Sequence, residues 1–144
     1  MKAISIREPW LFLILRPDII GDEARREAYA NGEIKDVENR TREIRFQGEV
    51  LLHASKSPAD DYRNLQLHYW NEKGIRIPDF KELQTGGIRA RAMFELPVDE
   101  SESEWFTGPF AYPIFSVEPV RFTPLKGALG FFNVPNELEK LWQT

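Results

Sequence analysis

The sequence predicts an α+β domain in which a small closed or nearly closed sheet of five or six strands carries three or four short peripheral helices. Several segments alternate apolar and polar residues with the period of two that a half-buried strand shows. Such segments dominate the second half of the chain, which argues against a doubly wound fold of alternating strands and helices. No linker or repeat interrupts the 144 residues, so we expect residues 1–144 to form a single domain.

The first half of the chain is expected to contain three strands and three helices. In order they are a strand over 2–7, a buried apolar helix over 10–15, a charged helix over 22–30, strands over 35–40 and 49–55, and a helix over about 58–73. Pro9 ends the first strand, and Asp22 is expected to cap the charged helix. Ser57 and Pro58 offer an N-cap and a first-position proline to the helix that follows, and Gly74 ends it.

The second half reads mostly as strands. The clearest is 87–96, where Ile88 and Ala90 begin a core-facing row. Segments 114–122 and 128–134 are two more strands, and the second is apolar on both faces, so we expect it to be central in the sheet. Prolines should keep 108–113 irregular. A terminal helix is expected to carry Leu138, Leu141 and Trp142.

Composition narrows the chemistry. The chain has no Cys, which excludes disulfides, thiolate nucleophiles and cysteine zinc sites, and is compatible with a reducing cytoplasm. Its imidazoles are those of His53 and His68, so we expect no histidine-rich metal site and no cofactor, although a carboxylate-bound Mg²⁺ stays open. No apolar run approaches a membrane span of roughly 20 residues, so we expect a soluble, cytoplasmic protein without a membrane partner.

The charge distribution leaves room for an anionic ligand. The net charge of −4 argues at first against nucleic acid, because phosphate binding needs a basic surface. Five acids lie between Glu95 and Glu104, however, with no Lys or Arg among them. The rest of the chain has 19 basic and 18 acidic residues, and this balance permits a local basic patch.

The segment Lys35-Asp36-Val37-Glu38-Asn39-Arg40 has the densest chemistry. In a strand Asp36, Glu38 and Arg40 share one face, and the turn after Asn31-Gly32 can bring the Lys35 ammonium to Glu38. A lysine beside a partly buried glutamate can tune a proton donor or hold an anion. The alternative is an exposed ladder of ion pairs. Asn39 points the other way, so we expect it to form a structural hydrogen bond.

Other candidate residues lie near strand ends and in a loop. His53, Ser55 and Lys56 end one strand together, which suits a binding site, although a purely structural histidine is slightly favoured. Arg7 on the first strand can contact phosphate or form a salt bridge with an acid.

The other aromatic and arginine side chains are expected either to bind a ligand or to have a structural role. Trp105 and Tyr112 flank Gly108-Pro109, where their rings either stack on a base or pack as a lid. Core packing is the expected role of Trp10, ahead of the alternative that it stacks on a base. Arg89 and Arg91 are expected to face solvent from the 87–96 strand.

Five blocks of this sequence resemble, in order, those of an ASCH domain, the domain named for homology to activating signal cointegrator 1. The blocks are Ser5-Ile6-Arg7-Glu8-Pro9-Trp10, Lys35 to Arg40, Gly48 to Lys56, Trp105-Phe106-Thr107-Gly108-Pro109 and Gly127-Ala128-Leu129-Gly130. They cover nearly the whole chain. The resemblance implies a PUA-like β-barrel with a cleft, in a family thought to bind RNA or other nucleic acids and sometimes to act on them.

The sequence departs from that family at two places. Residues 17–32 look like a helical insertion between the Pro-Trp helix and the lysine, where relatives have a shorter link. In addition, the branch that hydrolyses the acetyl amide of N4-acetylcytidine is similar at Lys35 and Arg40 but has a threonine nucleophile where this chain has Glu38. Because a carboxylate cannot replace that hydroxyl in the same acyl transfer, the amidohydrolase mechanism does not carry over intact.

Three functions follow as hypotheses. The first is a nucleic-acid-binding module whose polar cleft is built on Lys35, Glu38 and Arg40, with Arg7, His53, Ser55, Lys56, Trp105 and Tyr112 also contacting RNA or another nucleic acid. The second is a hydrolase acting on RNA or a modified nucleoside, ribonuclease-like or amidohydrolase-like, with Glu38 as general acid or base, Lys35 tuning it and Arg40 orienting the substrate. The third is a protein-interaction adaptor using the acidic 95–104 loop, for which the sequence gives no chemical support and names no protein partner.

Overall fold

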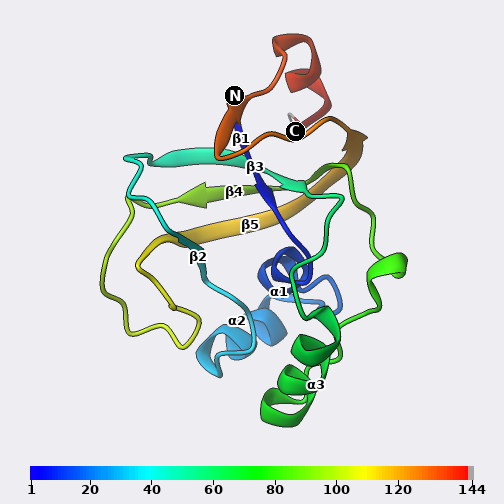
Figure 1. Ribbon diagram of the computed structural model, residues 1–144, viewed down its shortest axis with the longest axis vertical. Helices are drawn as coiled ribbons and strands as arrows, with labels where there is room; N and C mark the ends of the chain where they lie inside the picture. The colour runs from blue at the N-terminus through cyan, green and yellow to red at the C-terminus, as the bar shows by residue number, and fades with distance from the viewer. Residues whose placement is uncertain (143–144) are drawn as a thin grey trace.

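The computed structural model in Figure 1, described over residues 1–142, has an α+β fold built on a curled, half-barrel sheet of six strands. The strands are β1 (Lys2–Ile6), β2 (Val37–Arg40), β3 (Gly48–Ala54), β4 (Gly87–Phe94), β5 (Phe110–Pro124) and β6 (Phe131–Asn133). The α-helices are α1 (Trp10–Leu15), α2 (Asp22–Ala30) and α3 (Tyr62–Lys73), and two short 3₁₀ helices are η1 (Phe80–Glu82) and η2 (Asn136–Trp142).

The strand order across the sheet is β2-β5-β4-β3-β1-β6. Strands β1 and β3 are parallel, and their register places Ser5 opposite His53 and Ile6 opposite Ala54. The other neighbouring strands are antiparallel. The crossover from β1 to β3 contains α1, α2 and β2. The Lys35 to Arg40 segment therefore belongs to this connection, and its strand β2 lies at the edge of the sheet opposite β6.

The helices lie at the two ends of the sheet. Figure 1 shows α1, α2 and α3 gathered at one end, with η2 and the N-terminus at the other. Helix α1 is buried on almost every side, as its unbroken apolar sequence predicts, and its residues enter two of the hydrophobic clusters. No helix in residues 1–142 is long and apolar enough to cross a membrane.

The alternating faces predicted for the early strands are confirmed. Ile4 and Ile6 of β1 and Leu52 of β3 pack in the main cluster inside the curled sheet. The opposite faces of these strands contribute Ala3 and Leu51 to a separate cluster near η2. One departure occurs in β4. A register shift opposite Leu52 and His53 interrupts the predicted row, so Ile88 packs in the cluster near η2 and not in the main cluster.

The last two strands differ from the sequence prediction. Strand β5 begins at Phe110 and runs through Pro113, which was expected to interrupt it. Pro113 lies opposite Val37, but the amide of the next residue, Ile114, donates to the Asp36 carbonyl, so the ladder with β2 needs no N–H from Pro113. Strand β6 is an edge strand and not a central one. Its two faces are both apolar because Phe131 packs on the main cluster while Phe132 packs on the cluster near η2.

Helix boundaries also shift. Helix α2 begins at Asp22, but its N-cap residue is Gly21. Helix α3 begins only at Tyr62, after Asp61 in the left-handed region, so Ser57-Pro58 does not start it. The C-terminal helix is the 3₁₀ helix η2, in which Trp142 is buried and Leu138 packs nearby; the side chain of Leu141 lies outside the described residues, as do residues 143–144.

Candidate functional site

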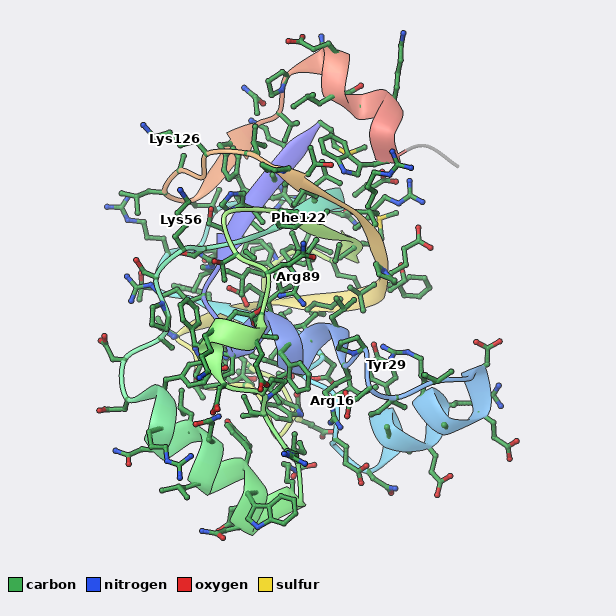
Figure 2. The ribbon with its side chains drawn as sticks, turned by 90° about the vertical axis from the view of Figure 1, so that its right-hand side faces the viewer. Arg16, Tyr29, Lys56, Arg89, Phe122 and Lys126 are labelled. Atoms are coloured by element: carbon green, nitrogen blue, oxygen red, sulfur yellow. The ribbon has the colours of Figure 1, made fainter. Side chains whose placement is uncertain are left out.

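A cleft of about 1030 Å³ opens where the ends of β1, β2 and β3 meet the segment that follows β5. Its lining residues come from five parts of the chain: Ser5, Ile6, Arg7, Trp10, Glu38, Arg40, His53, Ser55, Lys56, Gly86 and Pro124 to Gly130. We call residues 124–130 the cleft strap. Figure 2 shows Lys56 and Lys126, both of which line the cleft, on the same side of the molecule beside β1.

Six of the residues proposed from sequence line this cleft together. They are Arg7, Glu38, Arg40, His53, Ser55 and Lys56. The remaining three, Lys35, Trp105 and Tyr112, do not belong to its lining, and their side chains are buried elsewhere. The predicted cluster is therefore assembled in most of its members, although the sequence separates them by almost 50 residues.

Glu38 is held between two cations. Its Oε2 accepts a hydrogen bond from Arg40 Nε at 3.0 Å and lies 2.7 Å from Arg40 Nη2 in an ion pair. Its Oε1 lies 3.5 Å from Lys35 Nζ. Arg40 also donates through Nη2 to the Ser5 carbonyl at 2.9 Å, which ties β2 to β1 across the cleft. Glu38 is buried, so these contacts compensate its charge within the protein.

Lys35 is buried next to Glu38 and does not itself line the cleft. Its side chain is only 3% exposed, and Nζ donates to the Val37 carbonyl at 2.5 Å in addition to Glu38. Burial lowers the pKa of this amine, and the Glu38 carboxylate opposes that shift. Nζ also lies 5.9 Å from the ring centroid of Trp10, a cleft residue. The expected pairing with Glu38 is present, but the ammonium reaches the cleft only through Glu38 and Trp10.

Trp105 and Tyr112 occupy scaffold positions. The Trp105 indole is 5% exposed, stacks on Tyr69 and donates Nε1–H to the Gly32 carbonyl at 3.2 Å. Tyr112 is 1% exposed and donates its hydroxyl to the Ile44 carbonyl. Tyr112 lies opposite Glu38 in the β2–β5 register and packs in the main cluster, while Trp105 precedes β5 and packs in the second cluster. The expectation that these rings stack on a base is therefore corrected to one of packing.

Asn39 has the structural role predicted for it. Its amide joins β2 to the loop before β5, with Nδ2 donating to the Trp105 carbonyl and Oδ1 accepting from the amides of Thr107 and Gly108. These bonds fix the strand whose other face presents Glu38 and Arg40.

Two arginines expected to face solvent form ion pairs. Arg89 pairs with Glu8, whose side chain is fully buried beneath α1 and also accepts from the Phe12 amide. Burial raises the pKa of the Glu8 carboxyl, and Arg89 opposes that shift. Arg91 pairs with Glu118 of β5. The alternation of apolar and polar residues shows only which face of a strand a residue occupies. It could not predict that an acidic side chain lies next to each of these arginines.

Ser5 and His53 form a hydrogen-bonded pair on the cleft floor. Ser5 Oγ lies 3.1 Å from His53 Nδ1, and His53 Nε2 lies 2.5 Å from the Leu125 carbonyl. The parallel register places the two side chains next to each other on one face. Gly127 passes so close that a Cβ there would lie 2.6 Å from Ser5 Oγ, so only glycine fits without a shift.

Sequence reasoning missed the cleft strap, gave Ser5 no site role and favoured core packing over base stacking for Trp10. The block Gly127-Ala128-Leu129-Gly130 was a signal for the strap, since closely spaced glycines often mark a close backbone approach. Ser5 shared the polar face of the first strand with Arg7, and this was a weaker signal.

The cleft carries positive charge in a negatively charged chain. Four basic side chains, from Arg7, Arg40, Lys56 and Lys126, oppose the single carboxylate of Glu38 among the described lining residues, a formal charge of +3 with neutral His53. The strap adds an apolar wall, and Leu129 at its tip is fully exposed. Such a surface can hold an anionic group on one side and a flat apolar group on the other.

Within residues 1–142 no three His, Cys, Asp or Glu side chains gather in a way that could hold a metal ion. The chain matches no protein-family model and no curated protein.

Proposed function

We propose that the cleft binds a single-stranded nucleic acid, RNA in the first instance. The observation that carries the proposal is the separation of charge: the chain has a net charge of −4, yet its cleft has a formal charge of +3. A local basic surface is what phosphate binding needs. The resemblance of the sequence to ASCH domains, and the PUA-like barrel that it implies, agrees with this proposal.

We expect the phosphates to contact Arg7, Lys56 and Lys126. Arg7, Lys56 and Lys126 are exposed at the cleft, whereas the guanidinium of Arg40 already bonds to Glu38 and to the Ser5 carbonyl. Arg7 continues β1, Lys56 follows β3, and Lys126 lies on the strap. A chain of phosphates crossing the cleft would meet cations on both walls.

Trp10 is the aromatic side chain placed to contact a base. It lines the cleft, is half-buried, and is fixed by an edge-on contact with Tyr69 at 6.3 Å between ring centroids. Stacking of a base on an aromatic ring contributes about 1–3 kcal/mol, whatever the base. Trp10 thus takes the role that the sequence suggested for Trp105 and Tyr112.

The proposal is tested by fluorescence anisotropy of a labelled single-stranded RNA of about eight nucleotides, titrated at several salt concentrations. Three phosphate contacts predict a log-log salt slope of about −2, from about −0.7 per contact. Arg7→Ala and Lys56→Ala should each weaken binding and reduce the slope by about 0.7. Lys81→Ala, an exposed lysine of η1 outside the cleft lining, is the matched control and should bind like the wild type.

Binding that does not change with salt, or that Arg7→Ala and Lys56→Ala leave intact, would remove this proposal. A single-stranded DNA of the same length and sequence shows whether the 2′-hydroxyl contributes, because that group is what distinguishes RNA from DNA at a given site.

A hydrolase that uses Glu38 as general acid or base is the second candidate. It is favoured by one observation: Glu38 is a buried carboxylate that lines the cleft. Against it, both carboxylate oxygens contact cations, so neither is unengaged for proton transfer. The test is incubation with RNA and a panel of modified nucleosides, followed by mass spectrometry. A product formed by the wild type must be absent with folded Glu38→Gln and Lys35→Ala proteins; a product that persists refutes the role of Glu38.

A further inference from the structure

We infer that Ser5 and His53 form a nucleophile and general-base pair able to cleave a carboxylic ester, an activity independent of nucleic-acid binding and of Glu38. The inference begins with hydrogen-bond capacity. A carbonyl oxygen only accepts, so the 2.5 Å contact with the Leu125 carbonyl places the proton of the neutral imidazole on Nε2. Nδ1 then carries a lone pair, and it accepts the Ser5 hydroxyl proton across 3.1 Å.

This arrangement has the parts that serine activation requires. A serine hydroxyl becomes nucleophilic when a base is within hydrogen-bond reach and a third group orients that base. Here the base is His53 and the orienting group is the Leu125 carbonyl. The imidazole is also held edge-on by Phe132, at 5.8 Å between ring centroids, and it is almost fully buried.

The pair is rigidly placed and faces the cleft. Ser5 and His53 are direct partners in the parallel β1–β3 register, so their spacing is set by the sheet. Both line the cleft, and Ser5 is partly exposed there. A buried histidine that served packing alone would need no serine on its second nitrogen and no opening beside it.

Donors for a developing oxyanion lie next to the hydroxyl. Within the described residues, the amides of positions 126–130 donate to no backbone acceptor. These residues line the cleft, and Gly127 approaches Ser5 Oγ so closely that its own Cβ position would lie 2.6 Å away. Unengaged backbone N–H groups beside a nucleophile are the usual means of stabilising a tetrahedral oxyanion.

The reaction balances without a cofactor. Ser5 Oγ attacks the ester carbonyl carbon while its proton passes to His53 Nδ1, and the carbonyl oxygen becomes the oxyanion. Collapse breaks the bond to the alkoxy group, which takes the proton from His53 and leaves as the alcohol. Water then attacks the acyl-serine, again giving its proton to His53; collapse releases the carboxylic acid and returns the proton to Ser5. The exposed cations of the cleft favour an ester whose alcohol portion is anionic.

The test uses a fluorophosphonate probe and p-nitrophenyl acetate with the whole chain. We expect a single adduct by intact mass, mapped to the peptide that contains Ser5, and a burst of nitrophenolate. Ser5→Ala should abolish both, and His53→Gln should slow them by about 100-fold or more, the usual range for general-base catalysis being about 10²–10⁴-fold.

The matched control is Ser116→Ala, an exposed serine on β5 outside the cleft, which should react like the wild type. Circular dichroism confirms that each variant is folded; if His53→Gln does not fold, the wild-type adduct and Ser5→Ala decide the matter. No adduct, an adduct only at another residue, or a loss of less than about 10-fold in folded His53→Gln would overturn the inference. The hydrogen bonds of Ser5 and His53 would then serve only to hold the cleft strap in place. None of these results depends on RNA binding, so the two proposals fail separately.

Discussion

Replacing Asn39 by alanine is expected to lower the free energy of unfolding by about 2 kcal/mol. The side chain makes three hydrogen bonds, at 3.0 Å to the Trp105 carbonyl, 3.0 Å from the Thr107 amide and 3.3 Å from the Gly108 amide. A buried intramolecular hydrogen bond contributes about 1 kcal/mol net. The Thr107 bond is exposed and the Gly108 bond is long, so we count each at about half of that value.

Urea denaturation followed by circular dichroism measures this change. With a denaturant slope of about 1–3 kcal/mol per molar, a loss of about 2 kcal/mol moves the midpoint down by about 0.7–2 M. Arg42→Ala is the control, because Arg42 is exposed two residues beyond Arg40 and should stay within about 0.5 kcal/mol of the wild type. A midpoint for Asn39→Ala that matches that of Arg42→Ala would refute the reasoning, since the hydrogen bonds would then contribute nothing to stability.

Three further predictions concern parts of the scaffold. Burial raises the pKa of the Glu8 carboxyl, so the folded state holds its proton to higher pH than the unfolded chain does; the unfolding free energy of the wild type should therefore rise relative to Glu8→Gln as pH falls from neutral toward about 4.3. If urea titrations show that the difference in unfolding free energy between the wild type and Glu8→Gln narrows as the pH falls, the expected direction is wrong. Gly87→Ala should cost at least about 1–3 kcal/mol by thermal denaturation, because its Cβ would lie 2.5 Å from the backbone oxygen of Thr123, and an unchanged Tm would show that the sheet yields there. Arg25→Ala removes donors to three backbone carbonyls before α2, so amide exchange across α2 should accelerate while β3 stays protected; equal exchange in both proteins would count against this anchoring.

Local periodicity predicted the sheet residues well because it reports directly on burial. The faces of β1 and β3 follow from alternation alone, since one side of each strand packs in the main cluster. The position of a strand in the sheet is not local information. Phe131 and Phe132 give β6 two apolar faces, yet the strand lies at an edge because two separate clusters meet there.

The sequence predicted that Lys35 pairs with Glu38, but the burial of the Lys35 side chain away from the cleft was beyond sequence reasoning for a similar reason. The backbone N–H of Lys35 donates to the Leu13 carbonyl at 2.9 Å, so the entry to β2 is fixed by α1 and not by the strand pattern. That contact turns the ammonium inward, to the Val37 carbonyl. Likewise, the contact of His53 with the Leu125 carbonyl joins residues 72 positions apart, and no motif at His53 indicates it.

The placement of Lys35 changes how the charge of the cleft must be counted. Lys35 and Arg40 both contact Glu38, so the charge available to a ligand comes mainly from Arg7, Lys56 and Lys126, none of which forms an ion pair within the described residues. These three cations lie on three separate segments, after β1, after β3 and on the strap. A ligand that engages all of them must cross the cleft floor, where Ser5 and His53 lie. The same geometry that favours an extended anionic ligand therefore carries it over the Ser5 hydroxyl, for which we propose activation by His53.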